Sequence, residues 1–256
     1  MSTIGVVVIT KNEEAQLARC LDSVKPFADE IIVIDDASTD NTAKIAQRYG
    51  AKVFINESKG NFDMQRNIGI EQSSCEWILQ LDADEVLPAA TAGKILERIK
   101  HPGRYAAFNL KRKNFFLGKP ILNAGNYHNK TYLFCKDKGR YIGSIHETLK
   151  VDGETGFIEA EVFHYPFNSI GSFIDRQNYY SETEANVFLK KNRTPSKKYI
   201  KYQLTWKSIK NFYKLYVKKS GYKDGIHGLI WCLLNVIHTQ LFWMKIWEKA
   251  YKEDKP

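Results

Sequence analysis

The chain has 256 residues with 43% hydrophobic and 26% charged content, which is enough apolar material for a substantial core. Its four cysteines are far apart with no Cys-x-x-Cys pair, which argues against a zinc site or a disulfide framework and favours reduced thiols. The formal charge of +9 comes entirely from residues 195–256, with 13 lysines against 4 acids, because residues 1–194 carry 25 basic and 25 acidic side chains.

The chain opens with an apolar, β-branched run from Gly5 to Thr10, which predicts a strand covered on both faces. Asn12 is the expected cap of a helix that follows and that Pro26 ends. The apolar residues of that helix recur at helical spacing: Leu17, Cys20, Leu21 and Val24. A first strand-helix unit is therefore complete by about residue 25.

The same alternation continues through the first hundred residues. Strands are predicted at 30–34, 52–55 and from Trp77, and helices at 43–49 and 63–70. This order predicts an α/β fold with a Rossmann-like, mostly parallel sheet, flanked by helices and joined by right-handed crossovers. Ligands of such sheets bind beyond the carboxyl ends of the strands. The sequence has neither a Gly-x-Gly-x-x-Gly fingerprint nor a P-loop.

Polar clusters follow three of these strands, at residues 10–14, 35–40 and 82–85. We expect them to converge on one crevice, because the strands that precede them are predicted to be parallel. Asp82 and Asp84 are two positions apart at a strand end, and alternation would point them the same way. A hard divalent cation that both ligate would offset their repulsion. The alternative is an ordinary polar turn after a buried strand.

Four motifs carry a resemblance to a known family: VITKNEE at 8–14, VIDDASTD at 33–40, QRNIG at 65–69 and LDADE at 81–85. With them the chain resembles the family 2 glycosyltransferases of GT-A fold, and more narrowly the lipopolysaccharide core β-glucosyltransferases that act on inner-core heptose. The resemblance implies a UDP-sugar donor, a divalent metal (Mg²⁺ or Mn²⁺) and transfer with inversion.

The resemblance also implies a set of donor-binding residues. Thr10, Asn12 and Glu13 would line the nucleoside pocket, and Asp36 or Asp35 would accept the imide N–H of uracil. Arg66 and Asn67 match the family's Arg-Asn pair, and Lys59 is a further candidate. The full set for the nucleotide and donor is Thr10, Asn12, Glu13, Asp35, Asp36, Lys59, Arg66, Asn67, Asp82 and Ala83.

The remaining assignments concern the metal and the catalytic base. Asp84 and Asp82 are the expected metal ligands, and His164, at the end of an apolar run, is a third candidate that could instead be structural. Glu147, in the segment Gly143 to Leu149, resembles the family's His-Glu element and is our candidate general base, because inverting transfer needs one carboxylate at the acceptor hydroxyl. The alternative for Glu147 is an exposed strand residue.

Residues 195–256 form a separate basic, aromatic-rich helical region in our prediction, after a GT-A catalytic domain at 1–194. Aromatic and apolar residues recur on one helical face from Tyr199 to Tyr216, with lysines toward the other face. This composition is typical of a helix lying on an anionic membrane. Residues 225–244 have no charged side chain, but their polar residues favour shallow embedding or packing over a span. The alternative is a helical lid with a solvated lysine face.

The resemblance therefore implies a glycosyltransferase that moves a hexose, glucose from UDP-glucose being the first expectation, onto a lipopolysaccharide inner-core sugar. The expected location is cytoplasmic, peripheral on the inner face of the bacterial inner membrane, because no basic leader precedes the short apolar start. Another lipid-linked or cell-envelope acceptor is the main alternative. A sugar-nucleotide pyrophosphorylase and a non-catalytic nucleotide-binding module are further ones, and nucleic acid is not an expected partner because the crevice is acidic.

Overall fold

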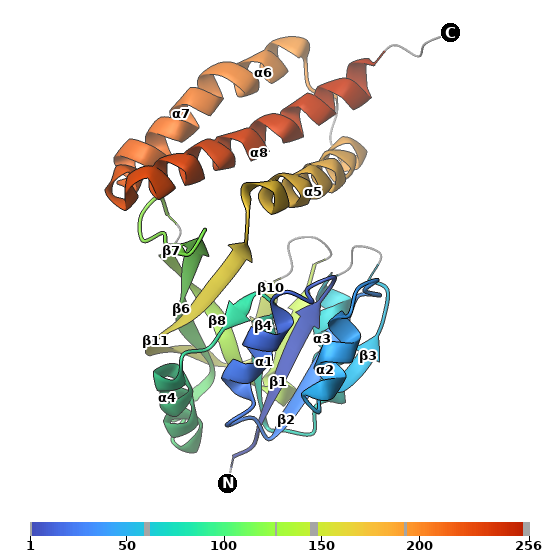
Figure 1. Cartoon of the computed structure of the whole chain (residues 1–256), viewed down its shortest axis with the longest axis vertical. Helices are drawn as coiled ribbons and strands as arrows, with labels where there is room; N and C mark the ends of the chain where they lie inside the picture. The colour runs from blue at the N-terminus through green and yellow to red at the C-terminus, as the bar shows by residue number, and fades with distance from the viewer. Residues whose placement is uncertain (1, 59–61, 126, 144–147, 192–193, 253–256) are drawn as a thin grey trace. The chain divides into compact units, whose positions relative to one another are not determined.

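The structure is a computed structural model that describes residues 2–58, 62–125, 127–143, 148–191 and 194–252. The chain forms two compact units (Figure 1). The first comprises Met1–Lys113 and His128–His164, and the second comprises Asn114–Tyr127 and Tyr165–Pro256. The boundary that we predicted between residues 194 and 195 falls inside the second unit.

Four parallel strands form one half of the main sheet. They are β1 (Ile4–Thr10), β2 (Glu30–Asp35), β3 (Lys52–Ile55) and β4 (Trp77–Asp82). They lie in the order β3-β2-β1-β4, and each pairs in parallel with its neighbour. The predicted α/β class with its parallel strands is confirmed.

Helices cover both faces of β1, which is why its sequence has no polar alternation. On one face Val6 and Val8 pack in a core with α1 (Leu17–Val24) and α2 (Thr42–Arg48). On the other face Val7 packs with Ile70 of α3 (Phe62–Gln72). The four residues predicted for the inner face of α1 are all buried. The remaining helix of this unit is α4 (Ala89–Lys100).

The sheet continues beyond β4 through strands from later in the chain, in the order β4-β8-β6-β11-β5 within a nine-stranded sheet. β8 (Tyr127–Cys135) is antiparallel to β4, and β5 (Glu85–Val86) is antiparallel to β11 (Glu154–Phe167). β6 (Tyr105–Phe116) also pairs with β7 (Lys119–Pro120). A short helical turn, η1 (Lys136–Lys138), leads into a separate hairpin of β9 (Gly139–Ile142) and β10 (Thr148–Val151).

The second unit is mainly helical. Its helices are α5 (Ile170–Lys191), α6 (Lys197–Tyr202), the π-helical turn η2 (Gln203–Lys207), α7 (Ser208–Tyr213), the π-helical turn η3 (Lys214–Lys218), the 3₁₀ turn η4 (Gly221–Asp224) and α8 (Gly225–Tyr251). Ala185 of α5, Ile200 of α6 and Trp243 and Ile246 of α8 are buried together. Because α5 shares this core with the C-terminal helices, residues 170–191 belong with them rather than with the sheet.

One segment, Gly221–Tyr251, is long and apolar enough to cross a membrane by length and composition alone. Its most apolar window has a mean hydropathy of 1.3, and 28% of that window is buried against the rest of the chain. Core helices of soluble proteins meet the same criterion, so this is weak evidence for a span.

Candidate functional site

The three predicted polar clusters lie at one edge of the sheet. In the parallel register Thr10 of β1 is opposite Asp35 of β2, and Ile9 is opposite Asp82 of β4. The carboxyl ends of these three neighbouring strands therefore meet, as parallel strands require. The clusters thus share one edge of the sheet, and the crevice expected there stays a prediction. Thr10 is buried there, and its Oγ1 has no hydrogen-bond partner among the described residues.

The loop after β1 is fastened to the loop after β2 by hydrogen bonds. Thr39 N donates to Asn12 Oδ1 at 2.8 Å, and Asn12 N donates to the Ser38 hydroxyl at 2.8 Å. Glu13 N donates to Thr42 Oγ1 at 2.8 Å. The prediction that Asn12 caps the first helix is wrong, since that helix begins at Leu17 and the Asn12 side chain is engaged by Thr39. Asn12 instead ties the loop after β1 to the loop after β2 at this edge of the sheet.

Asp35 and Asp36 are both buried at the end of β2. The Asp35 carboxylate accepts hydrogen bonds from Ser38. Asp36 accepts from Ser58 N at 2.6 Å and from the Ser58 hydroxyl at 2.9 Å, and it pairs with Lys11 Nζ at 3.1 Å. These contacts hold the carboxylates in place, and Ser58 immediately precedes the segment that contains Lys59, which lies outside the described residues.

Arg66 and Asn67 are presented by α3, which approaches β1 closely at Gly69. A Cβ on Gly69 would lie 2.2 Å from Val7 Cγ1, so only glycine permits this packing. Arg66 Nη2 lies 2.9 Å from Asp82 Oδ1, and the guanidinium carbon lies 5.2 Å from the centre of the Tyr141 ring. Asn67 exchanges two hydrogen bonds of 2.9 Å with the backbone of Tyr141. Arg66 thus reaches the acidic turn, while Asn67 anchors β9.

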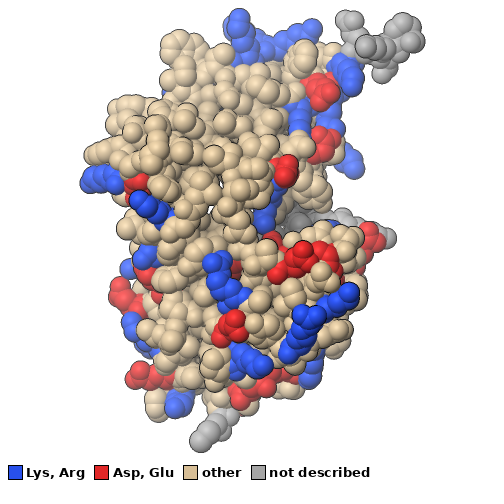
Figure 2. Space-filling view, viewed as in Figure 1, with Lys and Arg blue, Asp and Glu red and all other residues tan. Residues whose placement is uncertain are grey.

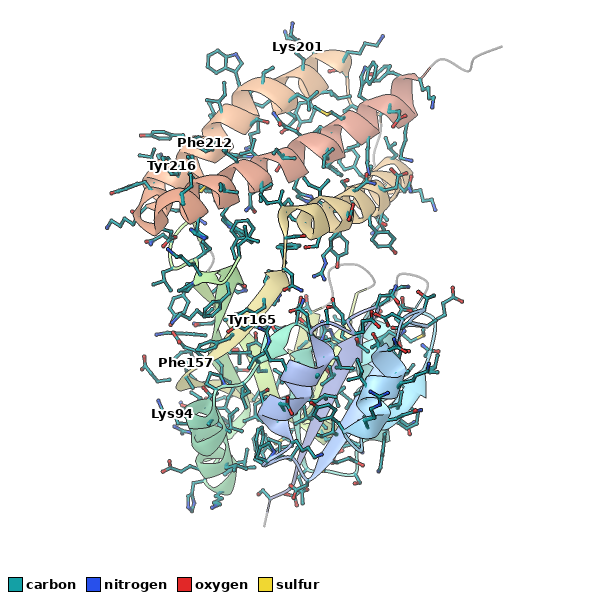
Figure 3. The ribbon with its side chains drawn as sticks, in the orientation of Figure 1. Lys94, Phe157, Tyr165, Lys201, Phe212 and Tyr216 are labelled. Carbon is teal, nitrogen blue, oxygen red and sulfur yellow. The ribbon has the colours of Figure 1, made fainter. Side chains whose placement is uncertain are left out.

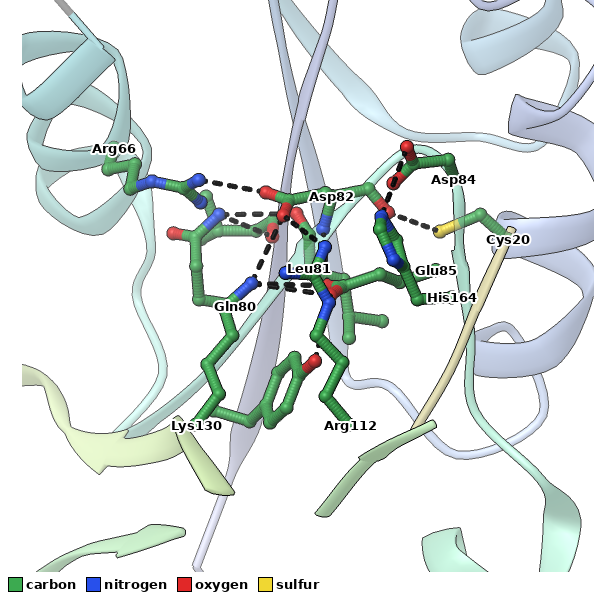
Figure 4. Close-up of polar contacts among 12 residues, drawn as sticks. Cys20, Arg66, Gln80, Leu81, Asp82, Asp84, Glu85, Arg112, Lys130 and His164 are labelled. Atoms are coloured by element: carbon green, nitrogen blue, oxygen red, sulfur yellow. Dashed lines mark hydrogen bonds and ion pairs between the residues drawn. The ribbon is translucent and has the colours of Figure 1, made fainter. Parts of the chain in front are cut away.

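Asp82 lies among three cationic side chains (Figure 4). Besides Arg66, Lys130 Nζ lies 3.0 Å from Asp82 Oδ2, and an Arg112 guanidinium nitrogen lies 3.9 Å from the same oxygen. Burial favours the neutral acid, but these cations outweigh it and hold the pKa of Asp82 well below its ordinary value. Asp82 is therefore ionised at neutral pH.

Glu85, in β5, is fully buried and forms ion pairs with two of these cations, Lys130 and Arg112. Its Oε1 lies 3.3 Å from Lys130 Nζ and 3.0 Å from Arg112 Nε, and it accepts a 2.7 Å hydrogen bond from the Tyr132 hydroxyl. Its Oε2 accepts from Asp82 N at 2.9 Å. Burial, reinforced by the negative charge of Glu85, raises the pKa of Tyr132 well above its ordinary value, so the phenol stays a donor.

Asp84 has a different partner from Asp82. Its Oδ2 lies 3.4 Å from His164 Nε2, and both side chains are largely buried. The pairing of β11 with β5, in which His164 is opposite Glu85, delivers the imidazole to this position. The strand alternation that predicted a common direction ends at Asp82, because Ala83 and Asp84 form a turn. Among described residues, no group of three or more His, Cys, Asp or Glu side chains is arranged to hold a metal.

The candidate base Glu147 lies outside the described residues, as does Lys59. Ile142 and Thr148, the residues on either side of the segment 143–147, pair with each other in the β9–β10 hairpin. The same hairpin is tethered to α3 through Tyr141 and Asn67. Both roles remain predictions from the sequence.

Sequence reasoning missed Arg112, Lys130 and Tyr132. They come from β6 and β8, which join the sheet after β4: β8 pairs antiparallel with β4, and β6 lies next to β8. The one local signal is the alternation in β8, which places Lys130 and Tyr132 on the same face. Nothing in the sequence says that this face meets Asp82 and Glu85.

All four cysteines are free thiols. Cys20 Sγ lies 3.7 Å from the Asp82 carbonyl oxygen, and burial together with the nearby Glu85 raises the pKa of this thiol well above its ordinary value. Cys20 is therefore a neutral packing residue beneath the acidic turn.

Comparison with known proteins places this site in a family. The chain is 28% identical over 245 residues to an uncharacterized glycosyltransferase of Rickettsia typhi, covering 90% of this chain and 82% of the relative. It is 25% identical over 261 residues to the lipopolysaccharide core biosynthesis glycosyltransferase LpsC of Rhizobium meliloti, covering 99% and 95%.

Among solved structures, the chain is similar to glucosyl-3-phosphoglycerate synthase from Mycobacterium tuberculosis in complex with Mn²⁺, UDP and glucosyl-3-phosphoglycerate. The TM-score is 0.40 at 18% identity, covering 53% of this chain and 57% of that one. The model of glycosyl transferase family 2 matches residues 5–144, the part of the chain that contains β1 to β9. The chain therefore belongs to glycosyl transferase family 2 and is a nucleotide-sugar-dependent glycosyltransferase.

Proposed function

We propose that the chain transfers a hexose, glucose from UDP-glucose in the first instance, to an inner-core sugar of lipopolysaccharide, with inversion at the anomeric carbon. One observation carries the proposal: Arg66, Asp82, Asp84 and His164 lie together at the carboxyl edge of the sheet. The similarity to LpsC, which spans nearly the whole chain, supports a lipopolysaccharide acceptor.

Asp84 and His164 fit a divalent metal. Two ligand atoms held at about 2.1 Å from one octahedral ion are about 3 Å apart, close to the 3.4 Å between His164 Nε2 and Asp84 Oδ2. A carboxylate oxygen and an imidazole nitrogen are ligands that Mn²⁺ accepts, and Mg²⁺ accepts the carboxylate readily. Asp82, in contrast, is already neutralised by Arg66 and Lys130, so we assign it to orientation of these cations and of the donor.

Bound here, the metal would supply positive charge to the diphosphate as the nucleoside diphosphate departs. The other roles would be taken by side chains of the protein. Arg66 would bind the diphosphate with its guanidinium, which Asp82 and the Tyr141 ring hold in one orientation. Thr10, Asn12, Asp35 and Asp36 would form the walls around the nucleoside, since all four lie at the ends of β1 and β2.

In the transfer step, the acceptor hydroxyl oxygen forms a bond to the anomeric carbon from one side while the bond to the diphosphate oxygen breaks on the other. Glu147 would take the hydroxyl proton, and UDP leaves with the bonding electrons. Single displacement of this kind inverts the anomeric configuration. We place the reaction at the cytoplasmic leaflet of the inner membrane, where a lipid-anchored acceptor is accessible.

The test is a panel of nucleotide sugars with Mn²⁺ and purified truncated core lipopolysaccharide. We expect transfer from UDP-glucose, with the product linkage inverted, and loss of transfer in Asp84→Ala and Glu147→Gln. Metal-dependent UDP release without transfer to core lipopolysaccharide would point to a different acceptor. Full transfer by both variants would remove the site assignment.

A further inference from the structure

The helix from Lys197 to Lys218, made of α6, η2, α7 and η3, has one packed face and one open face. On the packed face Ile200, Gln203 and Ser208 are buried. Gln240 of α8 donates to the Leu204 carbonyl at 3.2 Å, and the stacked rings of Phe212 and Tyr216 are half-buried (Figure 3). This helix therefore contributes only one of its faces to the core of the helical unit.

The open face carries large apolar and aromatic side chains at a spacing of three or four residues, which we name the aromatic stripe. Its members, with their exposed fractions, are Tyr202 (40%), Trp206 (65%), Ile209 (60%), Tyr213 (52%) and Val217 (43%). The alternative of a helical lid, with these aromatics in its core, does not fit such exposure. Single exposed apolar residues are normal on soluble proteins, but a continuous row of them marks an interaction surface.

Lysines accompany the stripe along its whole length. The segment 197–219 contains eight lysines and no acidic residue. Lys207, Lys210 and Lys214 are exposed, and none pairs with a carboxylate within the described part of the chain. In Figure 2 lysine and arginine atoms lie at several margins of the helical unit, around a broad surface without charged side chains. Lys207, Lys210 and Lys214 each follow a stripe residue by one position, so they lie beside the stripe on the helix. A partner that covers the stripe therefore also meets positive charge along its flank.

We propose that the aromatic stripe and its lysines dock on an anionic phospholipid surface. Trp, Tyr and Ile side chains would enter the headgroup region, and the lysines would meet lipid phosphates. A second copy of the chain fits less well, because a twofold contact through this face would bring unpaired lysines against lysines. The inference rests on the proposed function, since it deepens it by naming the surface that meets the membrane of a lipid-linked acceptor.

The experiment measures binding of the full chain to sedimented vesicles of phosphatidylglycerol with phosphatidylcholine, and to vesicles of phosphatidylcholine alone. We expect binding to the anionic vesicles only. The triple variant Trp206→Ser, Ile209→Ser, Tyr213→Ser should bind at least about tenfold more weakly, because its apolar contact is lost. The triple variant Lys207→Gln, Lys210→Gln, Lys214→Gln should lose at least about tenfold as well.

A matched control removes the same charge elsewhere: Lys25→Gln, Lys44→Gln, Lys100→Gln, three exposed positions of the first unit, should bind vesicles as the unaltered chain does. The stripe variants should keep metal-dependent UDP release and transfer to a delipidated core oligosaccharide. Unchanged vesicle binding by both stripe variants, or a dimer that dissociates in them without vesicle binding, would overturn the inference. The proposed function fails separately, if the unaltered chain transfers no sugar to the delipidated acceptor.

Discussion

The imidazole of His164 and the carboxylate of Asp84 face each other at 3.4 Å, although 80 positions separate them in the chain. Their approach depends on a two-residue strand: β5 follows the acidic turn directly and pairs with β11, so that His164 is opposite Glu85. The turn and its imidazole partner are thus fixed by one short ladder.

We expect Asp84→Asn and His164→Ala each to weaken Mn²⁺ binding in the presence of UDP by at least about 100-fold, since the first removes the negative charge of a ligand and the second removes the imidazole. The measurement is the rise in thermal midpoint that Mn²⁺ with UDP produces, which should disappear in both variants. His101→Ala, at an exposed histidine after α4, is the control and should keep the full rise. An undiminished rise in His164→Ala would assign His164 a structural role.

We expect the Arg66→Lys variant to bind UDP as weakly as the Arg66→Ala variant does. The guanidinium bonds to Asp82 and lies over the Tyr141 ring, and an ammonium group cannot keep both contacts while forking to a diphosphate. We expect either variant to weaken UDP binding by about tenfold or more, measured by calorimetry with Mn²⁺ present. Equal UDP affinity in Arg66→Lys and the unaltered chain would contradict a bidentate role.

Glu85→Gln should destabilise the fold as well as the site. The fully buried carboxylate faces Lys130 and Arg112, and neutralising it would leave two desolvated cations to share Asp82, at a cost of roughly 3 kcal/mol in the free energy of unfolding. Urea denaturation measures this cost. Glu159→Gln, which breaks an exposed pair with Lys111, should cost less than about 1 kcal/mol. Similar losses in the two variants would show that the Glu85 cluster contributes no special stability.

We expect Glu30, at the start of β2, to make the free energy of unfolding sensitive to acid. Burial would raise its pKa, but hydrogen bonds from Lys52, Ser74 and Ser73 lower it below the ordinary value of 4.5. A carboxyl whose pKa is lower when folded stabilises the protein above the unfolded-state pKa, and the contribution is lost as the pH falls from about 4.5 through the folded pKa.

The check is the pH dependence of the free energy of unfolding. In Glu30→Gln the stability at neutral pH should fall by roughly 2 kcal/mol, and the slope below about pH 4.5 should be shallower. Glu154→Gln, at an exposed pair with Arg104, should leave the curve nearly unchanged. A slope in Glu30→Gln as steep as in the unaltered chain would place the acid sensitivity elsewhere.

Much of the sheet edge follows from local sequence. The apolar runs before Thr10, Asp35 and Asp82 specify buried parallel strands. Neighbouring parallel strands have their carboxyl ends at the same edge of the sheet, independently of loop conformation. The helix at 17–24 was predictable from its periodic apolar residues. The cap at Asn12 was not, because a side chain that can cap a helix can equally bond to a neighbouring loop.

The cationic side chains around Asp82 could not be predicted from the sequence. Lys130 and Arg112 reach Asp82 only because β8 pairs with β4 and β6 follows it in the sheet. Such long-range antiparallel register leaves no local trace. The packing of α5 shows the same limit, since its sequence does not reveal that Ala185 is buried together with Trp243 and Ile246.

The most direct test of the proposed metal-diphosphate site is pulsed electron paramagnetic resonance of Mn²⁺ bound to the chain together with UDP. We predict that one Mn²⁺ ion shows hyperfine coupling both to a phosphorus nucleus of UDP and to an imidazole nitrogen, and that the nitrogen coupling disappears in His164→Ala. Phosphorus coupling without any imidazole coupling, unaltered in Asp84→Asn, would contradict a metal-diphosphate site at Asp84 and His164.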